Sequence, residues 1–235
     1  MTYEEMTSLL KEKGIQISEE SLRKLDEYLH LLIEWNERFN LTSIKTEGEI
    51  IEKHFYDCLL AADPSLLMEG KKVSDLGSGA GFPGLVWAIC FPEASYTLIE
   101  ATKKKCTFLE EVTHVLELSN VTIINGRVEE LPATFKESFD VVTARAVAEL
   151  RILAELALPL LKVNGTFVAM KGAHGEHELK DAEHACKALG VSKTSISLSS
   201  LPNDDGERCN IYLLKGKKTD KRYPRKYSDI LKKPL

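Results

Sequence analysis

The stretch VSDLGSGAGFPG, residues 73–84, decides the fold of this 235-residue chain. A short β-prone run ends at Asp75, glycines follow at Gly77, Gly79 and Gly81, and a helical pattern begins after them. Glycine lets the backbone turn sharply and approach a bound ligand closely at the carboxyl end of a strand. The stretch therefore predicts a strand, a ligand-binding loop and a helix in succession.

The same alternation continues downstream. The runs YTLIE, VTIIN, FDVVTARA and GTFVAMKG are β-prone, and helical patterns lie beside them at residues 82–91, 102–118, 148–161 and 175–189. Such alternation predicts an α/β, Rossmann-like fold with a doubly wound, mostly parallel sheet. VSKTSISLSSL and RCNIYLLKG have no helical pattern between them, which predicts an antiparallel C-terminal hairpin at the sheet's edge.

The N-terminal part of the chain has a helical pattern instead. Thr2 with Glu5 forms a capping-box signal, Ser18 opens a second and longer helix, and apolar spacing indicates a third at residues 50–59. We therefore expect a helical N-terminal cap over residues 1–66, an α/β domain over residues 67–214, and a C-terminal tail over residues 215–235 that packs on the domain or extends from it.

Composition excludes several classes of protein. No stretch approaches the ~20 apolar residues of a membrane helix, and the acidic, amphipathic N-terminus lacks the pattern of a signal peptide. The five cysteines are odd in number and none are spaced C-x-x-C, which argues against a disulfide framework or a zinc knuckle. We expect a cytoplasmic protein that makes no contact with membranes.

The net charge of −5 conceals an uneven distribution. Residues 215–235 hold nine basic and two acidic residues, a local charge of +7, whereas the other 214 residues hold 22 basic and 34 acidic residues, or −12. Such a tail is either a solubilising end or a strip that contacts phosphates. Composition alone leaves both interpretations open.

Two classes of cofactor use a glycine loop of this kind. Residues 79–84 match the dinucleotide pattern G-x-G-x-x-G, with Glu100 at a suitable distance for a ribose hydroxyl. In dinucleotide-binding proteins the first glycine of the pattern directly follows the hydrophobic part of the strand, whereas Asp75, Leu76, Gly77 and Ser78 precede Gly79 here. Read as acidic-x-G-x-G-x-G, residues 75–81 resemble motif I of the methyltransferases that use S-adenosylmethionine (SAM), whose ammonium group suits a nearby carboxylate. We favour SAM.

Further candidate residues follow the next strands. Glu100 ends the second strand, where its carboxylate can accept both hydroxyls of an adenosine ribose. Val128 and Glu129 follow the third strand, where an adenine base commonly lies. Arg145 ends the fourth and is expected to point into the ligand crevice, although pairing with a local acid such as Glu149 is the alternative.

Several segments together resemble one family, the bacterial small-subunit ribosomal RNA guanine-N7 methyltransferases (RsmG, also called GidB). The resemblance covers essentially the whole chain. Its segments are NERFNLTSI (residues 36–44), KHFYDCL (53–59), DLGSGAGFPGL (75–85), TLIEATKKKCTFL (97–109), GRVEEL (126–131), VTARAVAEL (142–150) and the terminal KRYPRKYSDILKKPL. The glycine loop is common to many methyltransferases, so the Asn-Leu-Thr segment and the tail make the resemblance specific.

The resemblance implies SAM contacts at Gly77, Phe82, Val128, Glu129 and Arg145. All but Phe82, which would otherwise be assigned to the core, agree with the positions argued from the strand ends, and Asp75, Gly79 and Glu100 complete the predicted cofactor site. One departure is Cys58, where relatives often have serine, and we attach little consequence to it.

The resemblance also implies the reaction, methylation of a guanine N7 in 16S ribosomal RNA near the decoding site. N7 carries an unprotonated lone pair and needs no general base, so we nominate no catalytic residue. The substrate is naked rRNA, the small subunit or an assembly intermediate, and we expect a monomer. RNA-binding candidates are the basic residues Lys103, Lys104, Lys105, Arg127, Lys171, Lys221, Arg222 and Arg225.

Other interpretations remain open from the sequence. The chain is either a methyltransferase acting on another RNA or a small molecule, or a non-catalytic RNA-binding protein of ribosome assembly that keeps a vestigial cofactor fold. His174, His177 and His184 resemble a metal cluster only superficially, because no acids or thiols lie near them at a tetrahedral spacing. We expect no metal.

Overall fold

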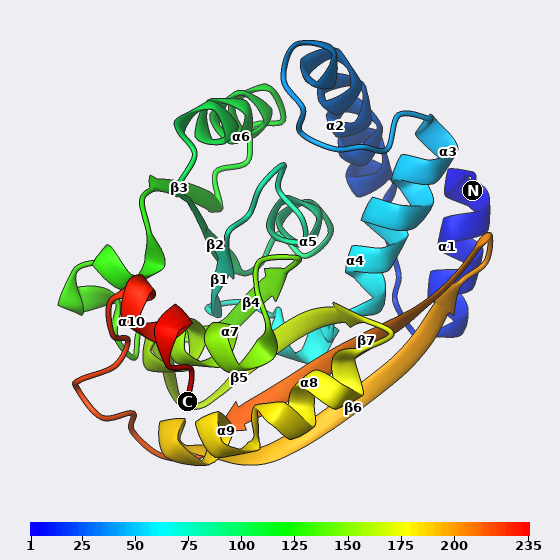
Figure 1. The fold of residues 1–235 in the computed structure, drawn as a ribbon. Helices are drawn as coiled ribbons and strands as arrows, with labels where there is room; N and C mark the ends of the chain where they lie inside the picture. The colour runs from blue at the N-terminus through cyan, green and yellow to red at the C-terminus, as the bar shows by residue number, and fades with distance from the viewer.

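The computed structural model describes residues 1–203 and 206–235, and of residues 204–205 only the strand to which they belong. In this described part of the chain, seven strands form one sheet in the order β3-β2-β1-β4-β5-β7-β6 (Figure 1). β7 runs antiparallel to both of its neighbours, and the other strand pairs are parallel. The predicted Rossmann-like sheet with an antiparallel C-terminal hairpin is confirmed.

The strands of the sheet match the β-prone runs of the sequence. They are β1 (Lys72–Leu76), β2 (Ser95–Glu100), β3 (Val121–Asn125), β4 (Phe139–Arg145), β5 (Leu161–Gly172), β6 (Val191–Leu201) and β7 (Asp204–Lys215). Because β1 to β4 are parallel neighbours, their carboxyl ends meet along one edge of the sheet. That edge carries the predicted cofactor residues.

The N-terminal helices begin where the sequence places their caps. The side chain of Thr2 accepts a hydrogen bond from the backbone of Glu5 in a complete capping box, and Ser18 accepts one from Ser21 N–H. The helices are α1 (Tyr3–Glu12) and α2 (Glu19–Arg38), followed by the contiguous α3 (Glu47–Ile50), η1 (Ile51–Tyr56) and α4 (Asp57–Leu60). η1 is a π-helical turn, which the apolar spacing of the sequence does not reveal.

The remaining helices connect the strands and cover both faces of the sheet (Figure 1). They are α5 (Gly84–Cys90), α6 (Lys103–Val115), α7 (Leu150–Ala157), α8 (Gly175–Asp181), α9 (Glu183–Leu189) and α10 (Tyr227–Lys232), with short 3₁₀ turns η2 (Pro64–Leu66), η3 (Val128–Glu130), η4 (Ala133–Phe135) and η5 (Leu158–Leu160). The single helical pattern predicted at residues 175–189 is divided into α8 and α9.

Two hydrophobic clusters lie on opposite faces of the sheet. Val141 and Val168 belong to the cluster that includes the N-terminal helices, α5 and α6, whereas their neighbours Val142 and Phe167 belong to the cluster with α7, α9 and α10. Successive strand residues alternate between the faces, as the pleat requires. The N-terminal helices are thus part of the main core rather than an appendage.

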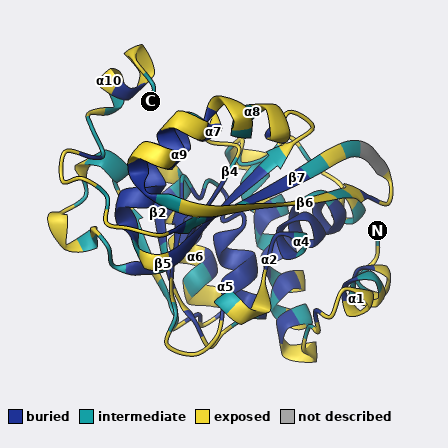
Figure 2. Cartoon of the chain, turned by 90° about the horizontal axis from the view of Figure 1, so that it is seen from below, coloured by how far each residue is buried: buried dark blue, intermediate teal, exposed yellow. Residues whose placement is uncertain are grey.

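The hairpin strand β6 differs from the central strands, because it is exposed along most of its length (Figure 2). The central strands are buried by helices on both sides. In residues 1–203 and 206–235 no helix is long and apolar enough to cross a membrane.

The basic tail packs against the α/β body. Lys215 is the last residue of β7, and its fully buried ammonium group donates to the carbonyls of Leu158 and Leu161. Tyr223 and Ile230 are buried in the cluster beneath α7. Part of the tail therefore serves the fold itself.

Candidate functional site

The glycine loop follows β1 and crosses the end of β2. The backbone N–H groups of Gly77 and Ser78 donate to the carbonyl of Ile99, at 2.8 and 3.2 Å. Gly77 has φ +67°, and a Cβ there would lie 2.8 Å from a methyl group of Val147. A side chain at this position would strain the backbone and displace Val147.

Asp75 lies beneath the loop rather than in its wall. The side chain is buried; its Oδ2 accepts the Gly84 N–H at 3.0 Å, and its Oδ1 has no hydrogen-bond partner among the described residues. Burial raises the pKa of Asp75 to about 7, and the negative charge of Glu100 acts in the same direction. An orphaned buried carboxylate oxygen of this kind favours a cationic ligand nearby.

Glu100 ends β2, and its carboxylate accepts hydrogen bonds from the backbone of the glycine loop and of the residues after β2. Its Oε2 accepts the Gly79 N–H at 2.9 Å, and its Oε1 accepts the Thr102 N–H at 2.7 Å. Each carboxylate oxygen can accept a second hydrogen bond, so both remain suited to the hydroxyls of a ribose. The structure thus brings Glu100 to the glycine loop, as the βαβ spacing predicts.

Val128 and Glu129 lie in η3, just beyond the end of β3, and both are half-buried. Glu129 accepts a hydrogen bond from Arg127 Nε at 2.7 Å, and the Arg127 guanidinium lies 5.0 Å from the Tyr227 ring centroid. Arg127 therefore has partners within the protein, although its side chain is still 47% exposed.

Arg145 ends β4, but the N-terminal helices hold its guanidinium group. Nη1 lies 3.3 Å from Asp57 Oδ2, and Nη2 donates to the Lys53 carbonyl at 3.0 Å. Arg145 does pair with an acid, but that acid is Asp57 rather than Glu149, which pairs with Arg151. The partner acid comes from α4, far back in the chain, which local sequence inspection does not find.

Phe82 connects the glycine loop to the same helices. It is only 8% exposed, its ring stacks on the His54 imidazole with centroids 4.2 Å apart, and the Arg145 guanidinium lies 5.6 Å from its centroid. The residue is buried, as its apolar character suggests, and it also lies at the candidate site. Its role in binding a cofactor stays a prediction.

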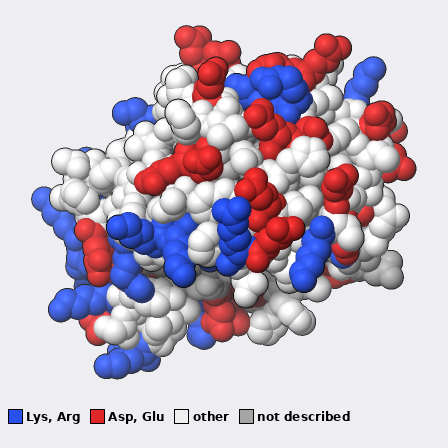
Figure 3. Space-filling model, turned by 90° about the horizontal axis from the view of Figure 1, so that it is seen from above, with Lys and Arg blue, Asp and Glu red and all other residues white. Residues whose placement is uncertain are grey.

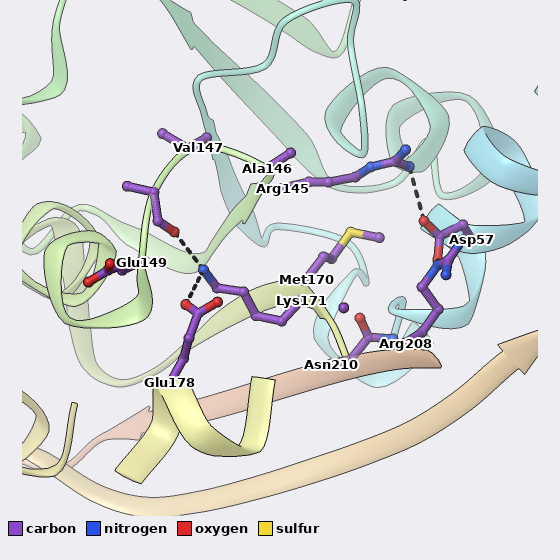
Figure 4. A pocket seen from close by; sticks show the side chains of 12 residues that line it. Asp57, Arg145, Ala146, Val147, Glu149, Met170, Lys171, Glu178, Arg208 and Asn210 are labelled. Carbon is purple, nitrogen blue, oxygen red and sulfur yellow. Dashed lines mark hydrogen bonds and ion pairs between the residues drawn. The ribbon is translucent and has the colours of Figure 1, made fainter. Parts of the chain in front are cut away.

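Beside Arg145 a cavity of about 520 Å³ opens at the carboxyl ends of β4 and β5 (Figure 4). Its charged lining includes Asp57, which pairs with Arg145 on one side and with Arg208 of β7 at 3.1 Å on the other. Lys171 also lines it, pairing with Glu178 at 2.7 Å. The remaining lining residues are Ala146, Val147, Ala148, Glu149, Met170, Gly172 and Asn210.

Sequence inspection does not find most of this cavity. Asp57 lies within the segment KHFYDCL, but nothing in its local pattern links it to Arg208, which is 151 positions away. Lys171 is a predicted RNA-binding residue; its side chain is 8% exposed and donates to the Ala148 carbonyl as well as pairing with Glu178. In this structure Lys171 faces the cavity rather than an open surface.

The other RNA-binding candidates differ in their exposure. Lys103, Lys104, Lys221 and Arg222 are exposed, whereas Lys105 is half-buried. Arg225 makes three hydrogen bonds to the carboxylate of Glu155, which is fully buried, so its charge stabilises the packing of the tail. Lys and Arg side chains gather toward the left of Figure 3, the side on which α10 lies in Figure 1.

His174 precedes α8, His177 lies in α8 and His184 lies in α9. Across residues 1–203 and 206–235, no group of three histidine, cysteine, aspartate or glutamate side chains could hold a metal ion. His177 instead lies 3.2 Å from Asp181, one turn further along its helix.

The chain is similar to known proteins along its whole length. The family model described as rRNA small subunit methyltransferase G matches residues 21–205. The ribosomal RNA small subunit methyltransferase G of Oceanobacillus iheyensis is 43% identical over 237 residues, which cover all of both chains. That of Bacillus subtilis is 42% identical over 237 residues, which cover all of this chain and 99% of the relative.

A solved structure agrees on the fold. The crystal structure of M. jannaschii TYW2 in complex with AdoMet, which is SAM, is similar with a TM-score of 0.52 at 14% identity, over 63% of this chain and 71% of that chain. At this identity the similarity shows the fold alone.

Proposed function

The chain belongs to the family of the rRNA small subunit methyltransferase G, and we propose that it transfers a methyl group from SAM to N7 of a guanine in 16S rRNA near the decoding site. The observation that carries the proposal is full-length similarity of about 40% to proteins named for rRNA methylation. The carboxylates beneath and beside the glycine loop support SAM as the cofactor.

The residues at the strand ends fit SAM. We propose that Glu100 accepts the ribose hydroxyls, that Val128 and Glu129 flank the adenine, and that Gly77 and Gly79 give the ligand close access to the backbone. Phe82 and Arg145 complete the site, and the negative charge of Asp75 favours the cationic ligand. SAM supplies a methyl group on a sulfonium, an electrophile that a neutral nitrogen can attack directly.

The cavity at the ends of β4 and β5 is suited to the acceptor base. Its volume of about 520 Å³ is sufficient for a purine, and it borders Arg145, one of the proposed cofactor residues. A base enters such a cavity only when it is out of its stack. Arg145 and Arg208 present hydrogen-bond donors at the cavity although both pair with Asp57, and no side chain has to remove a proton from N7.

Catalysis in this scheme depends on alignment. Holding a nucleophile and an electrophile in line supplies several kcal/mol of barrier lowering without an acid or base. We therefore propose no general base, and we propose that the chain acts as a cytoplasmic monomer, which light scattering of the purified protein tests.

The decisive experiment maps N7-methylguanine in the 16S rRNA of a strain that lacks the gene, by chemical cleavage at the modified base. One modification is expected to disappear and to return when the gene is restored. SAM binding with every modification intact would indicate another substrate. Absence of SAM binding in calorimetry would indicate the vestigial, non-catalytic alternative.

A further inference from the structure

The guanidinium group of Arg145 is held by groups that come from the N-terminal helices. Nη2 lies 2.9 Å from Nδ1 of His54 and donates to the Lys53 carbonyl at 3.0 Å. The Arg145 side chain is only 20% exposed. A single turn, η1, therefore provides two of the contacts that fix the direction of Arg145.

The contact with Arg145 assigns the tautomer of His54. Nδ1 of His54 lies 2.9 Å from Arg145 Nη2 and 3.1 Å from the Lys53 carbonyl oxygen. Because a guanidinium group only donates hydrogen bonds, we assign Nδ1 as the unprotonated acceptor of Nη2, and the Lys53 carbonyl then accepts its hydrogen bond from Nη2. The ring proton then lies on Nε2, which donates to Thr42 Oγ1 at 2.8 Å. Thr42 Oγ1 also accepts the Ile44 N–H at 3.1 Å, so the hydroxyl is itself held in place.

The loop before the helices is anchored in turn. Asn36 Oδ1 accepts the backbone N–H groups of Leu41 and Thr42, at 2.8 and 3.0 Å. A continuous series of hydrogen bonds thus leads from the end of α2 through Thr42 and His54 to Arg145. The segment with the sequence NERFNLTSI, residues 36–44, provides its outer half.

His54 has no freedom to act as an acid or base in this arrangement. The imidazole is only 6% exposed and stacks on Phe82. Burial, and next the positive charge of Arg145, lower the pKa of His54 to about 3. The ring therefore stays neutral at any working pH, and its contribution is geometric.

We propose that His54, supported by Thr42, is a positioning residue that orients the Arg145 guanidinium at the edge of the acceptor cavity. Asp57 and the Lys53 carbonyl also hold the guanidinium group, and each further contact removes rotamers that a free arginine samples. Methyl transfer is sensitive to alignment. The inference deepens the proposed function and rests on it for the activity measurements. It gives residues 36–44 a role in the reaction, since they include Thr42, whose hydroxyl holds the histidine.

Paired substitutions test the outer hydrogen bond. Thr42→Val removes the hydroxyl at nearly constant shape and is expected to lower kcat about fivefold, with the KM values for SAM and rRNA within twofold of wild type. Thr42→Ser keeps the hydroxyl and should restore kcat. Thr46→Val, which loses only an exposed bond to Glu49, is the matched control and should leave kcat unchanged.

A double-mutant cycle tests whether His54 acts through Arg145. His54→Phe should lower kcat roughly tenfold or more in the wild-type background and have no further effect when Arg145 is already alanine. An equal loss in both backgrounds would overturn the proposal, because His54 would then act on the fold or on another group. Circular dichroism melts of each variant show whether it remains folded.

Nitrogen NMR of ¹⁵N-histidine-labelled protein gives a measurement that needs no activity. His54 should show a protonated Nε2 and an unprotonated Nδ1, unchanged between pH 5 and 8, and Thr42→Val should shift the Nε2 signal. The opposite tautomer would overturn the inference even in an active enzyme. Conversely, the expected tautomer in a protein that does not methylate guanine would leave the hydrogen bonds intact and refute the proposed function instead.

Discussion

Asp75 and Glu100 are both carboxylates at the glycine loop, yet their surroundings differ. Glu100 accepts one backbone N–H on each oxygen, whereas Asp75 accepts one from Gly84 and leaves Oδ1 without a partner among the described residues. Because a buried ion without full hydrogen bonding is costly, the proton is held by Asp75 up to about pH 7. Sequence spacing predicts both acids at the loop but does not reveal that their hydrogen bonding differs.

The raised pKa makes a prediction about cofactor affinity. Between pH 5.5 and 7.5 the wild-type protein should bind SAM more tightly as pH rises, by about fivefold to tenfold, because Asp75 ionises and attracts the cationic ligand. Calorimetry at constant ionic strength measures this. Asp75→Asn removes the titrating group and is the control for titration of the ligand itself; an identical pH dependence in this variant would contradict the prediction.

The same carboxyl affects stability in the opposite direction. Its pKa of about 7 in the folded state lies above the usual value of 3.8 for an aspartate. Between these values the folded chain binds a proton that the unfolded chain does not, so this group's contribution to the free energy of unfolding decreases as pH rises from about 4 to about 7. The site thus gives up stability near neutral pH, where a cationic cofactor benefits from the charge.

At the scale of elements, the turn from β1 into α5 depends on glycines whose positive φ would strain any other residue. Gly81 has φ +103°, and a Cβ there would lie 2.5 Å from Leu85 Cδ1 and 2.7 Å from Tyr28 Oη. Tyr28 belongs to α2, so this glycine also sets how closely the N-terminal helices approach the loop. The Tyr28 hydroxyl donates to the Ala80 carbonyl in the same loop.

Gly81→Ala should therefore lower the free energy of unfolding by about 2 kcal/mol or more, since it combines backbone strain with overpacking. Chemical denaturation followed by circular dichroism measures the loss. Gly126→Ala is the matched control: a Cβ at Gly126 would meet only Ile124 Cγ2, at 3.9 Å, and its φ is not positive. Similar losses in the two variants would show that the close approach to Tyr28 is unimportant.

Local elements could be predicted from the sequence where the signal itself is local. The Thr2 and Ser18 caps mark helix starts, and the β-prone runs mark the strands, because these patterns reflect nearby hydrogen bonds and the burial of one face. The π-helical turn η1 and the pair of Asp57 with Arg208 could not be predicted. The pair depends on how β7 aligns beside β5 and on how α4 packs near both.

The tail illustrates the same limit. Its nine basic residues look alike in sequence, yet Arg225 is bound to Glu155, whose carboxylate is fully buried, whereas Arg222 pairs with Asp220 at the surface. The two arginines differ in whether the acid they pair with is buried. Arg225, whose partner is buried, stabilises the fold, whereas Arg222 remains accessible to solvent and RNA.

Substitutions at these two arginines should separate the roles. Arg225→Ala leaves the buried Glu155 carboxylate with the backbone N–H of residue 225 but without a positive charge beside it, and is expected to lower the free energy of unfolding by about 3 kcal/mol. Arg222→Ala should change it by less than about 0.5 kcal/mol. Urea denaturation of both variants measures the difference. Equal stabilities would show that the tail does not depend on the pair with Glu155.

At the scale of the whole molecule, the tail remains basic and the rest of the chain acidic even when the two tail cations that stabilise the fold, Lys215 and Arg225, are not counted. Lys217, Lys218, Lys221 and Arg222 are exposed on the tail, whereas Lys215 is buried and Arg225 is paired with a buried acid. Deleting residues 215–235 would therefore also damage the fold, because it removes Lys215, Tyr223 and Ile230 from the interior. A test of RNA binding by the tail needs charge substitutions rather than truncation.

The double variant Lys221→Gln, Arg222→Gln provides that test. If these side chains bind phosphates, affinity for 16S rRNA should fall, and the slope of log K against log salt should become shallower by about 0.7 to 0.9 for each phosphate that is no longer neutralised. SAM affinity and the melting temperature should not change, because both side chains are exposed.

The matched control is Lys11→Gln, Lys13→Gln, which removes two exposed lysines at the end of α1, far from α10 in Figure 1. Filter binding over 50 to 200 mM salt measures the slopes for both variants. Equal changes in the two slopes would mean that RNA binding depends only on the overall charge of the protein and that the tail has no specific part in it.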